Sequence, residues 1–224
     1  MSEVAGKSRI TWSFSALKEF KTCPRKYHAN RVLKLYPHQD TEATIYGKVV
    51  HKAAEDYIRD GTPLAEGLEQ FQRMLDSLRA IPGEKLCELE MALLPDCSPC
   101  DFKDDARWVR GIADLVIING GKAWTVDYKT GNAKYPDVSQ LELMALMVFA
   151  HYPDVETIHA ALLFTRHNKL VPAMYYRKDE ATMWRKWTID VGAIERSHEV
   201  DVWNPNPNGL CRKWCPVTHC EHCG

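Results

Sequence analysis

The feature that most constrains the fold is the alternation of charged and neutral residues in Val126-Asp127-Tyr128-Lys129-Thr130-Gly131. Side chains alternate between the two faces of a β-strand, so Asp127 and Lys129 point to the same side of one strand. The run Gly111-Ile112-Ala113-Asp114 comes before it, and Asn119-Gly120-Gly121 supplies a short turn between the two. The sequence therefore predicts a β-hairpin that brings Asp114 beside Asp127 and Lys129 at one end of a sheet.

Charged residues at the end of a buried strand must find partners, and a divalent cation would supply one. Two carboxylates can hold a hard cation, while the lysine offers a positive charge and a donor near an attacking water. This arrangement suits metal-assisted hydrolysis of a phosphodiester. An isolated Asp-x-Lys is also common as a solvated charge pair, but the apolar neighbours Trp124 and Val126 favour the functional interpretation.

The amphipathic helix expected over residues 41–58 could add a third ligand type. His51 and Glu55 share one helix face because they are four residues apart. Gly47, one turn earlier, permits close approach of another part of the backbone. Glu55 could touch a second ion or pair with a lysine of its own helix, and a lone helix histidine is often only structural.

Gln140 lies one turn into the next expected helix, over residues 137–151. Its amide could hold a phosphate or the attacking water. The alternative is an ordinary glutamine on a helix surface.

The whole pattern predicts an α/β fold with a central mixed sheet flanked by helices. We expect a single domain with a helical part at 11–80, a catalytic α/β core at 86–200 and a cysteine-rich tail at 204–224. The formal net charge is −1, so no global field draws the protein to nucleic acid.

Two segments, 18–34 and 165–187, combine Lys and Arg with aromatic residues. This composition suits a path for single-stranded nucleic acid, in which cations follow phosphates and rings stack on bases. It equally suits solvated helix faces with apolar sides in the core, and composition favours that second interpretation.

The N-terminal stretch from Met1 to Ile10 has no apolar signal-peptide core, and the longest apolar run, Met144 to Ala150, is too short to cross a bilayer. We therefore expect an intracellular, cytoplasmic protein with no membrane partner.

Four of the eight cysteines fall near the end of the chain, at Cys211, Cys215, Cys220 and Cys223. In a reducing compartment such clustering favours metal ligation over disulfides. All four could surround Zn²⁺ in a closed structural site, and His219 and His222 could substitute as ligands. Free thiols on a frayed terminus are the alternative.

Taken in order, these motifs resemble the PD-(D/E)XK nucleases, and in particular the RecB-like branch that includes CRISPR-associated exonucleases and many phage recombination nucleases. The resemblance implies a restriction-endonuclease-like core. It runs through Ser13-Phe14-Ser15-Ala16-Leu17, Cys23-Pro24-Arg25-Lys26-Tyr27, Gly47, His51, Glu55, Gly111-Ile112-Ala113-Asp114, Asp127-Tyr128-Lys129-Thr130-Gly131, Gln140 and the terminal cysteines.

By this resemblance, the side chains of His51, Asp114 and Asp127 and the carbonyl of Tyr128 bind Mg²⁺ or Mn²⁺. Lys129 orients or helps to deprotonate the water that attacks phosphorus in line, and the number of ions is left open. Gln140 joins the same site.

The family often has a tyrosine four residues after the helix glutamine. Met144 stands there in this chain, which leaves the substrate contact at that helix undefined.

The resemblance also implies a [4Fe–4S] cluster held by Cys23 and three of the four tail cysteines, with Zn²⁺ as the alternative. The x3, x4, x2 spacing of the tail departs from the x2, x5 spacing usual among the late cysteines of that branch.

The function implied is a Mg²⁺-dependent DNA exonuclease of bacterial or phage origin, acting in recombination, repair or replication. Its substrate would be DNA that is single-stranded or has a free end. The chain lacks a G-x-x-x-x-G-K-[ST] motif, so any helicase activity must come from a helicase or recombination partner. A structure-specific endonuclease and a catalytically silent nucleic-acid-binding protein with a structural metal site are the alternatives.

Overall fold

The computed structural model describes residues 10–37, 39–134 and 136–223. Nearly all of the Met1 to Ile10 stretch lies outside the described residues. The chain forms two compact units: Asp40–Trp184, which we call the sheet unit, and Met1–Gln39 with Arg185–Gly224, which we call the terminal unit.

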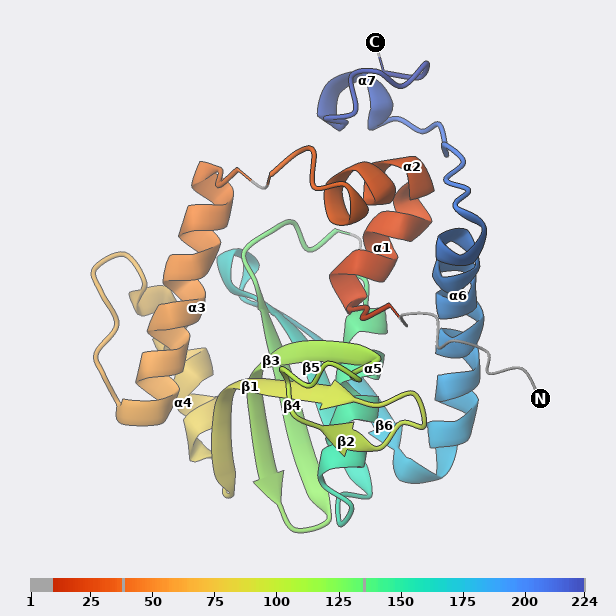
Figure 1. Ribbon diagram of the computed structural model, residues 1–224. Helices are drawn as coiled ribbons and strands as arrows, with labels where there is room; N and C mark the ends of the chain where they lie inside the picture. Colours follow the sequence, from red (N-terminus) through yellow and green to blue (C-terminus); the bar gives the residue numbers. More distant parts are fainter. Residues whose placement is uncertain (1–9, 38, 135, 224) are drawn as a thin grey trace, which may run out of the picture. The chain divides into compact units, whose positions relative to one another are not determined.

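The sheet unit is built on one six-stranded mixed sheet with the order β2-β1-β3-β4-β5-β6 (Figure 1). Only β4 and β5 pair in parallel; the other neighbours are antiparallel. The predicted hairpin is β3–β4, and Gly120 takes a positive φ of 55° in its turn. The strands are β1 (Glu84–Leu93), β2 (Pro99–Cys100), β3 (Val109–Asn119), β4 (Lys122–Lys129), β5 (Thr157–Phe164) and β6 (Lys169–Tyr176).

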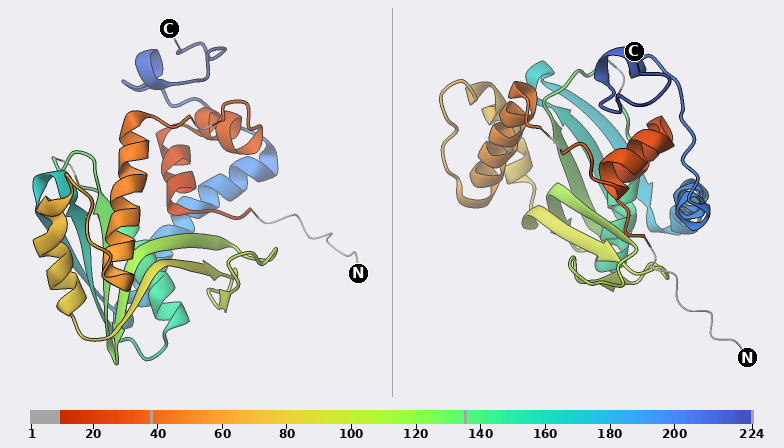
Figure 2. Two further views of the ribbon diagram at one scale, coloured as in Figure 1. Left: turned by 90° about the vertical axis from the view of Figure 1, so that its left-hand side faces the viewer. Right: turned by 45° about the horizontal axis from the view of Figure 1, so that its top comes forward.

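Two helices, α3 (Glu42–Asp60) and α4 (Gln72–Ala80), form one core with the sheet (Figure 2). A short 3₁₀ turn, Glu69–Phe71, leads into α4. Thr41 caps α3 through a capping box, and Gly61 ends it in a left-handed conformation. The core residues are Val50, Ala54, Tyr57, Ile58, Leu68, Phe71, Leu75, Leu115, Ile117, Val126, Tyr128 and Leu163.

The helix α5 (Ser139–His151) is largely buried, and it packs against all six strands. Gly111 of β3 lets it come close, since a Cβ there would lie 2.6 Å from Cε of Met144. Met144 is only 4% exposed and therefore belongs to the core. The mixed sheet with helices against it confirms the predicted α/β class.

The terminal unit contains α1 (Phe14–Thr22), α2 (Pro24–Tyr27), a π-helix (His28–Val32), most of α6 (Glu180–Val200) and α7 (Cys211–Trp214). Ser13 caps α1 by accepting a hydrogen bond from the backbone N–H of Ala16 at 3.3 Å. Cys23 is extended, and Pro24 starts the next helix at a position where its missing N–H costs nothing. Trp12 stacks on Trp187 with ring centroids 5.9 Å apart.

The helical part assigned from sequence to residues 11–80 is divided between the two units. The helices of residues 40–80 bury their apolar faces on the sheet, whereas residues 11–39 group with the chain after residue 184. Helical periodicity shows that a segment has an apolar face, but it does not show which surface covers that face.

None of the helices in the described ranges combines the length and the apolar character that spanning a bilayer requires.

Arg177, at the start of the 3₁₀ turn Arg177–Asp179, closes the C-terminal end of α5. Its Nη2 donates to the carbonyl oxygens of Phe149 at 3.1 Å and Tyr152 at 2.8 Å, and its Nε donates to that of Val155 at 2.7 Å. The guanidinium also lies 4.9 Å from the centroid of the Phe149 ring. One side chain thus satisfies carbonyls that the end of the helix leaves unpaired.

Replacing this arginine with alanine (Arg177→Ala) should lower the free energy of unfolding by about 2–4 kcal/mol, since three charge-assisted hydrogen bonds are lost together. Urea denaturation measures this change. Arg196→Ala removes an exposed helical arginine that pairs with Glu199 and should change stability by less than about 0.5 kcal/mol. Equal effects of the two substitutions would contradict the capping role.

Candidate metal centre

The candidate site begins where β3 and β4 stop pairing. Their ladder ends at the pair Leu115–Val126. One residue further, Oδ2 of Asp114 accepts a hydrogen bond from the backbone N–H of Tyr128 at 2.7 Å. The carboxylate thus replaces the strand carbonyl that would otherwise satisfy this N–H.

Alternation along β4 sends its side chains to two different faces of the sheet. Val126 and Tyr128 belong to the core beneath α3 and α4, so Asp127 and Lys129 point to the other face. There Nζ of Lys129 lies 2.6 Å from Oδ2 of Asp127. The sequence placed these two residues on one side of a strand, and the structure brings them into direct contact.

Gln140, in the first turn of α5, connects these two charged groups. Its Nε2 donates to Oδ1 of Asp127 at 2.6 Å, and its Oε1 accepts from Nζ of Lys129 at 2.9 Å. Gln140 is therefore part of the charged cluster and is not an isolated surface glutamine.

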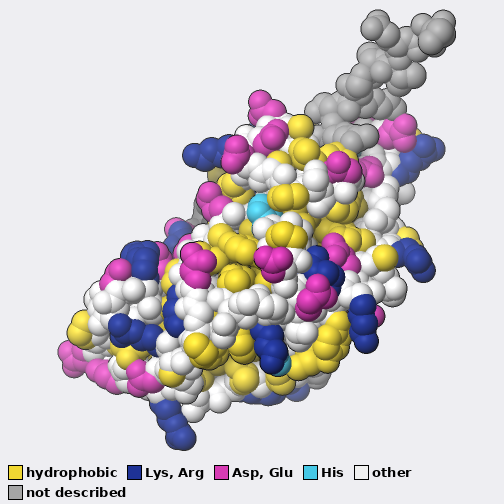
Figure 3. Space-filling model, turned by 90° about the horizontal axis from the view of Figure 1, so that it is seen from below, with side chains coloured by type: hydrophobic (Ala, Val, Ile, Leu, Met, Phe, Trp, Pro, Cys, Tyr) yellow, Lys and Arg dark blue, Asp and Glu magenta, His cyan; other side chains and the backbone are white. Residues whose placement is uncertain are grey.

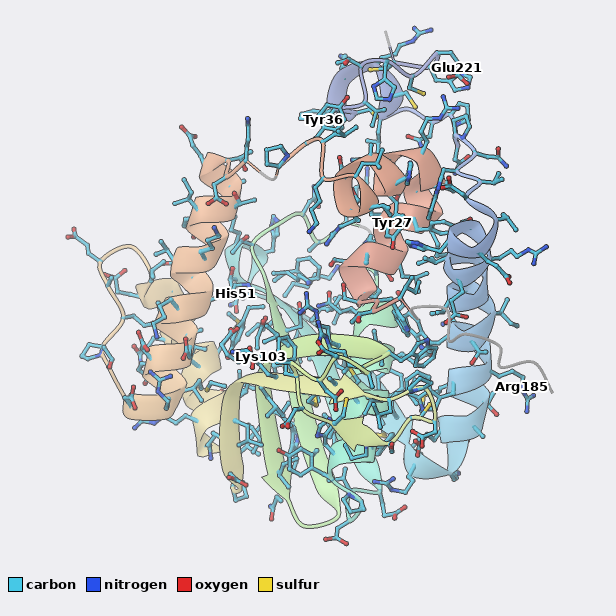
Figure 4. The ribbon with its side chains drawn as sticks, in the orientation of Figure 1. Tyr27, Tyr36, His51, Lys103, Arg185 and Glu221 are labelled. Atoms are coloured by element: carbon cyan, nitrogen blue, oxygen red, sulfur yellow. The ribbon has the colours of Figure 1, made fainter. Side chains whose placement is uncertain are left out.

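His51 reaches the cluster from α3, on the side of that helix that faces the strands (Figure 4). Its Nδ1 lies 3.4 Å from Oδ1 of Asp114, and its ring meets the Tyr128 ring edge-on with centroids 5.8 Å apart. Gly47 lets α3 lie close to the end of β4, because a Cβ there would be 3.3 Å from Oγ1 of Thr130. The gap between β3 and β4 thus receives side chains from both faces of the sheet.

Glu55 does not join this group. It pairs with Lys52 at 3.2 Å and with Arg59, which agrees with the second of the two roles considered for it.

Glu88 of β1 is a site residue that the sequence analysis missed. One ligand atom each from His51, Glu88 and Asp114 lie within 4.8 Å of one another. The flanking pairs Cys87–Leu115 and Leu89–Ala113 place Glu88 opposite Asp114 in the sheet. Only the register between β1 and β3 reveals this, because along its own strand Glu88 looks like a solvent-facing polar residue.

The backbone at Glu88 is also unusual, since its φ of 51° lies in the left-handed region. A glutamate rarely adopts this conformation within a strand, and such residues concentrate at functional sites. Desolvation, together with the charge of Asp114, raises the pKa of the Glu88 carboxyl.

Burial and neighbouring carboxylates both disfavour ionisation of the acidic groups at this site. Burial and the nearby charge of Asp114 raise the pKa of Asp127 to about 6. Burial lowers the pKa of His51, but the hydrogen bond to Asp114, the charges of Asp114 and Asp127 and a hydrogen bond with the Tyr128 backbone outweigh it and raise that pKa overall.

The residues present suit a hard divalent cation. Asp127 is 7% exposed, and its Oδ2 contacts Lys129 but receives no hydrogen bond of good geometry within the described residues. Carboxylate oxygens with one imidazole are ligands that Mg²⁺ and Mn²⁺ accept. Ligand atoms of His51, Glu88 and Asp114 lie close enough together to share one cation, whereas Asp127 is not in that group and its oxygens face Lys129 and Gln140. A cation held there would offset the charge of Asp114, which adds to the burial that raises the Asp127 pKa.

A second candidate site lies in the terminal unit, where Cys23 and all four tail cysteines line one pocket. Backbone N–H groups contact two of the sulfurs: that of Asn206 lies 3.4 Å from Sγ of Cys23, and that of Asn208 lies 3.3 Å from Sγ of Cys211. Nη1 of Arg25 lies 3.7 Å from Sγ of Cys220. Donors directed at sulfur are suited to thiolate ligands.

The chain after α6 is held against α1 and α2, which returns the tail to Cys23. Trp203 stacks on His28 with centroids 4.6 Å apart and meets Tyr27 at 5.8 Å. The side chains of Asn206 and Asn208 both donate to the carbonyl of Thr22, at 3.1 and 3.2 Å. The loop before the cysteines therefore positions them.

The two basic, aromatic segments are mostly structural. Phe20, Tyr27, Trp184 and Trp187 are buried, so they are unavailable to stack on bases. Lys21, Arg25 and Arg31 form ion pairs with Asp190, Glu221 and Glu19. On the face drawn in Figure 3, Lys and Arg are interspersed with Asp and Glu and form no basic patch.

Comparison with known proteins identifies the family of this chain. Residues 11–87 and 68–221 match the family model of the PD-(D/E)XK nuclease superfamily. A crystal structure of an Eubacterium rectale protein named as a candidate exonuclease superposes with a TM-score of 0.53 at 12% identity, covering 94% of this chain and 86% of that one. This likeness supports the restriction-endonuclease-like fold.

Two phage proteins are similar in sequence. The Gene 69 protein of Mycobacterium phage L5 is 29% identical in an alignment of 154 residues that covers 61% of this chain and 51% of that protein. The Gene 69 protein of Mycobacterium phage D29 is 28% identical in an alignment of 160 residues that covers 68% of this chain and 56% of that protein. The chain thus spans about half the length of the curated relatives it matches.

Divalent cation binding should weaken as the pH falls below about 6, because the cation must displace the proton that Asp127 holds there. The raised pKa of His51 acts in the same direction. Without a bound cation, the pKa of Asp127 is higher in the folded protein than in the unfolded chain. The contribution of Asp127 to stability is therefore present below its ordinary pKa and is lost as the pH rises through about 6.

The increase in melting temperature caused by Mn²⁺ should therefore be small at about pH 5 and large at about pH 8. Calorimetric titration gives the affinity at each pH. An affinity that stays constant over this range would contradict the assignment, and Asp127→Asn should flatten the pH dependence around 6.

Proposed function

Because the chain belongs to the PD-(D/E)XK nuclease superfamily, we propose that it is a divalent-cation-dependent DNA exonuclease. The observation that carries the proposal is the meeting of Asp114, Asp127 and Lys129 where β3 and β4 separate, with His51 and Glu88 beside them. A silent binding protein would have no need for a lysine held in contact with a buried carboxylate.

Each residue has a role that follows from its position. His51, Asp114, Asp127 and the Tyr128 carbonyl would hold the cation, and Glu88 would add a carboxylate from β1. When bound, Mg²⁺ or Mn²⁺ polarises the phosphoryl oxygen and lowers the pKa of water.

Lys129 supplies the charge and the proton donor at the reacting phosphate. Its ammonium group contacts Asp127 and Gln140. From this position Lys129 would hold the attacking water and stabilise charge on the phosphate oxygens, while Gln140 would keep its Nζ in place.

The preference for DNA ends is supported by the similar Eubacterium rectale protein named as a candidate exonuclease, and a phage setting is supported by the two Gene 69 proteins. The proposed enzyme acts in recombination, repair or replication. Its substrate is DNA that is single-stranded or has a free end, and a partner protein supplies any unwinding. A structure-specific endonuclease remains the second candidate, since the same residues would cut within a strand.

For the terminal unit we propose a structural metal cofactor, a [4Fe–4S] cluster held by Cys23 and three tail cysteines, with Zn²⁺ as the alternative. The shared pocket and the N–H groups directed at sulfur support it. Such a group would join residues from both ends of the chain.

Lys129→Gln should reduce Mg²⁺-dependent cleavage of linear DNA by about 10²–10⁴-fold, the usual contribution of a positioned proton donor. The cation affinity should not fall, because the ammonium group no longer competes for Asp127. Lys122→Gln is a matched control, because it removes an exposed lysine from the opposite end of the same strand. Release of nucleotides from end-labelled DNA provides the measurement.

Circular single-stranded DNA separates the two nuclease candidates, since an end-dependent enzyme leaves it intact. Wild-type protein that cleaves no DNA with Mg²⁺ or Mn²⁺, whether linear or circular, would overturn the nuclease proposal.

Protein purified without oxygen should be brown, with a broad absorption band at about 400 nm, and should contain iron. Cys23→Ser should lose that colour, whereas Cys87→Ser in the sheet unit should keep it. Zinc without iron would establish the alternative cofactor, and neither metal in freshly prepared protein would contradict a metal site at these cysteines.

A further inference from the structure

Arg166 lies at the same edge of the sheet as the charged cluster. Strands β4 and β5 are parallel, and Lys129 pairs with Phe164 at their carboxyl ends. The chain then enters the 3₁₀ turn Thr165–His167, in which Oγ1 of the buried Thr165 donates to the carbonyl of Lys129 at 3.2 Å. This bond fixes the residue before Arg166 against the residue that carries the ammonium group.

A ring from α3 holds the guanidinium of Arg166. Its Cζ lies 4.4 Å from the centroid of the Tyr46 ring. Tyr46 precedes Gly47, which packs against Thr130, and it is five residues before His51 on the same helix. Arg166 is thus held between the two elements that carry His51 and Lys129.

Arg166 has no ion-pair partner among the residues that the structure describes, unlike the basic residues of α3. Lys48 pairs with Asp40, Lys52 with Glu55 and Asp56, and Arg59 with Glu55, Asp56 and Asp60. Within the described ranges, no carboxylate lies within ion-pair distance of the exposed Arg166.

A nucleic acid strand approaching this site meets the carboxylates of Glu88, Asp114 and Asp127, which repel its phosphates. A fixed cation at the rim of the site would offset that repulsion. Arginine stacked on an aromatic face keeps its N–H edge free to bind phosphate through two parallel hydrogen bonds.

We propose that Arg166, held over Tyr46, binds a backbone phosphate of the substrate strand next to the phosphate that is cleaved. This inference rests on the proposed nuclease function and adds a substrate-binding residue to it. The tyrosine orders the guanidinium before the strand arrives, so less rotamer freedom is lost on binding.

The test compares Arg166→Gln with wild type on a single-stranded oligonucleotide. The KM for cleavage should rise about tenfold while kcat changes less than about threefold. The slope of log affinity against log salt, measured with Ca²⁺ in place of Mg²⁺, should become shallower by about one unit, the contribution of one phosphate contact. Mn²⁺ affinity and melting temperature should stay at wild-type values.

Two further substitutions locate the effect. Tyr46→Phe should behave as wild type because it keeps the ring, and Tyr46→Ala should raise KM in the same direction as Arg166→Gln. Arg59→Gln, which removes an arginine whose charge is already paired, should leave KM unchanged.

Wild-type KM and salt slope in Arg166→Gln would overturn the inference, as would a loss confined to kcat. If wild-type protein binds the oligonucleotide but cuts no DNA, and Arg166→Gln still weakens binding, then the nuclease proposal fails and the phosphate contact stands.

Discussion

The site depends on one hydrogen bond, from the backbone N–H of Tyr128 to the carboxylate of Asp114. Two paired strands cannot separate inside a protein without leaving backbone groups unsatisfied, and each such group is costly. Here a side chain supplies the missing acceptor, so β3 and β4 diverge with this N–H satisfied. The opening admits His51 from the α3 face and places it beside Asp114, while the side chain of Asp127 lies on the opposite face.

The charged groups of the site contact one another in two pairs. Lys129 and Gln140 contact the oxygens of Asp127, while His51 approaches Asp114. A cation held by Asp127 would compete with the ammonium group of Lys129 for that carboxylate, so cation binding and the position of the lysine would be linked.

Sequence reasoning succeeded where the information is local. Strand alternation and a glycine turn were enough to bring Asp114, Asp127 and Lys129 to one end of the hairpin, whereas the helical spacing grouped His51 with Glu55, which pairs elsewhere. Glu88 was missed because its place depends on the register between two strands separated by a long loop. The same limit explains the division of the N-terminal helices: an apolar face is visible in the sequence, whereas the surface that covers it is not.

The terminal unit is discontinuous, since the whole sheet unit is inserted between its two segments. Residues 40–184 are therefore synthesised before the cysteines that lie near Cys23. Domains generally fold as units in the order in which they emerge, so the sheet can begin to assemble while α1 and α2 still lack their partner segment. The terminal unit can complete its fold only after the whole sheet unit has been made, so its folding depends on contacts between segments far apart in the sequence.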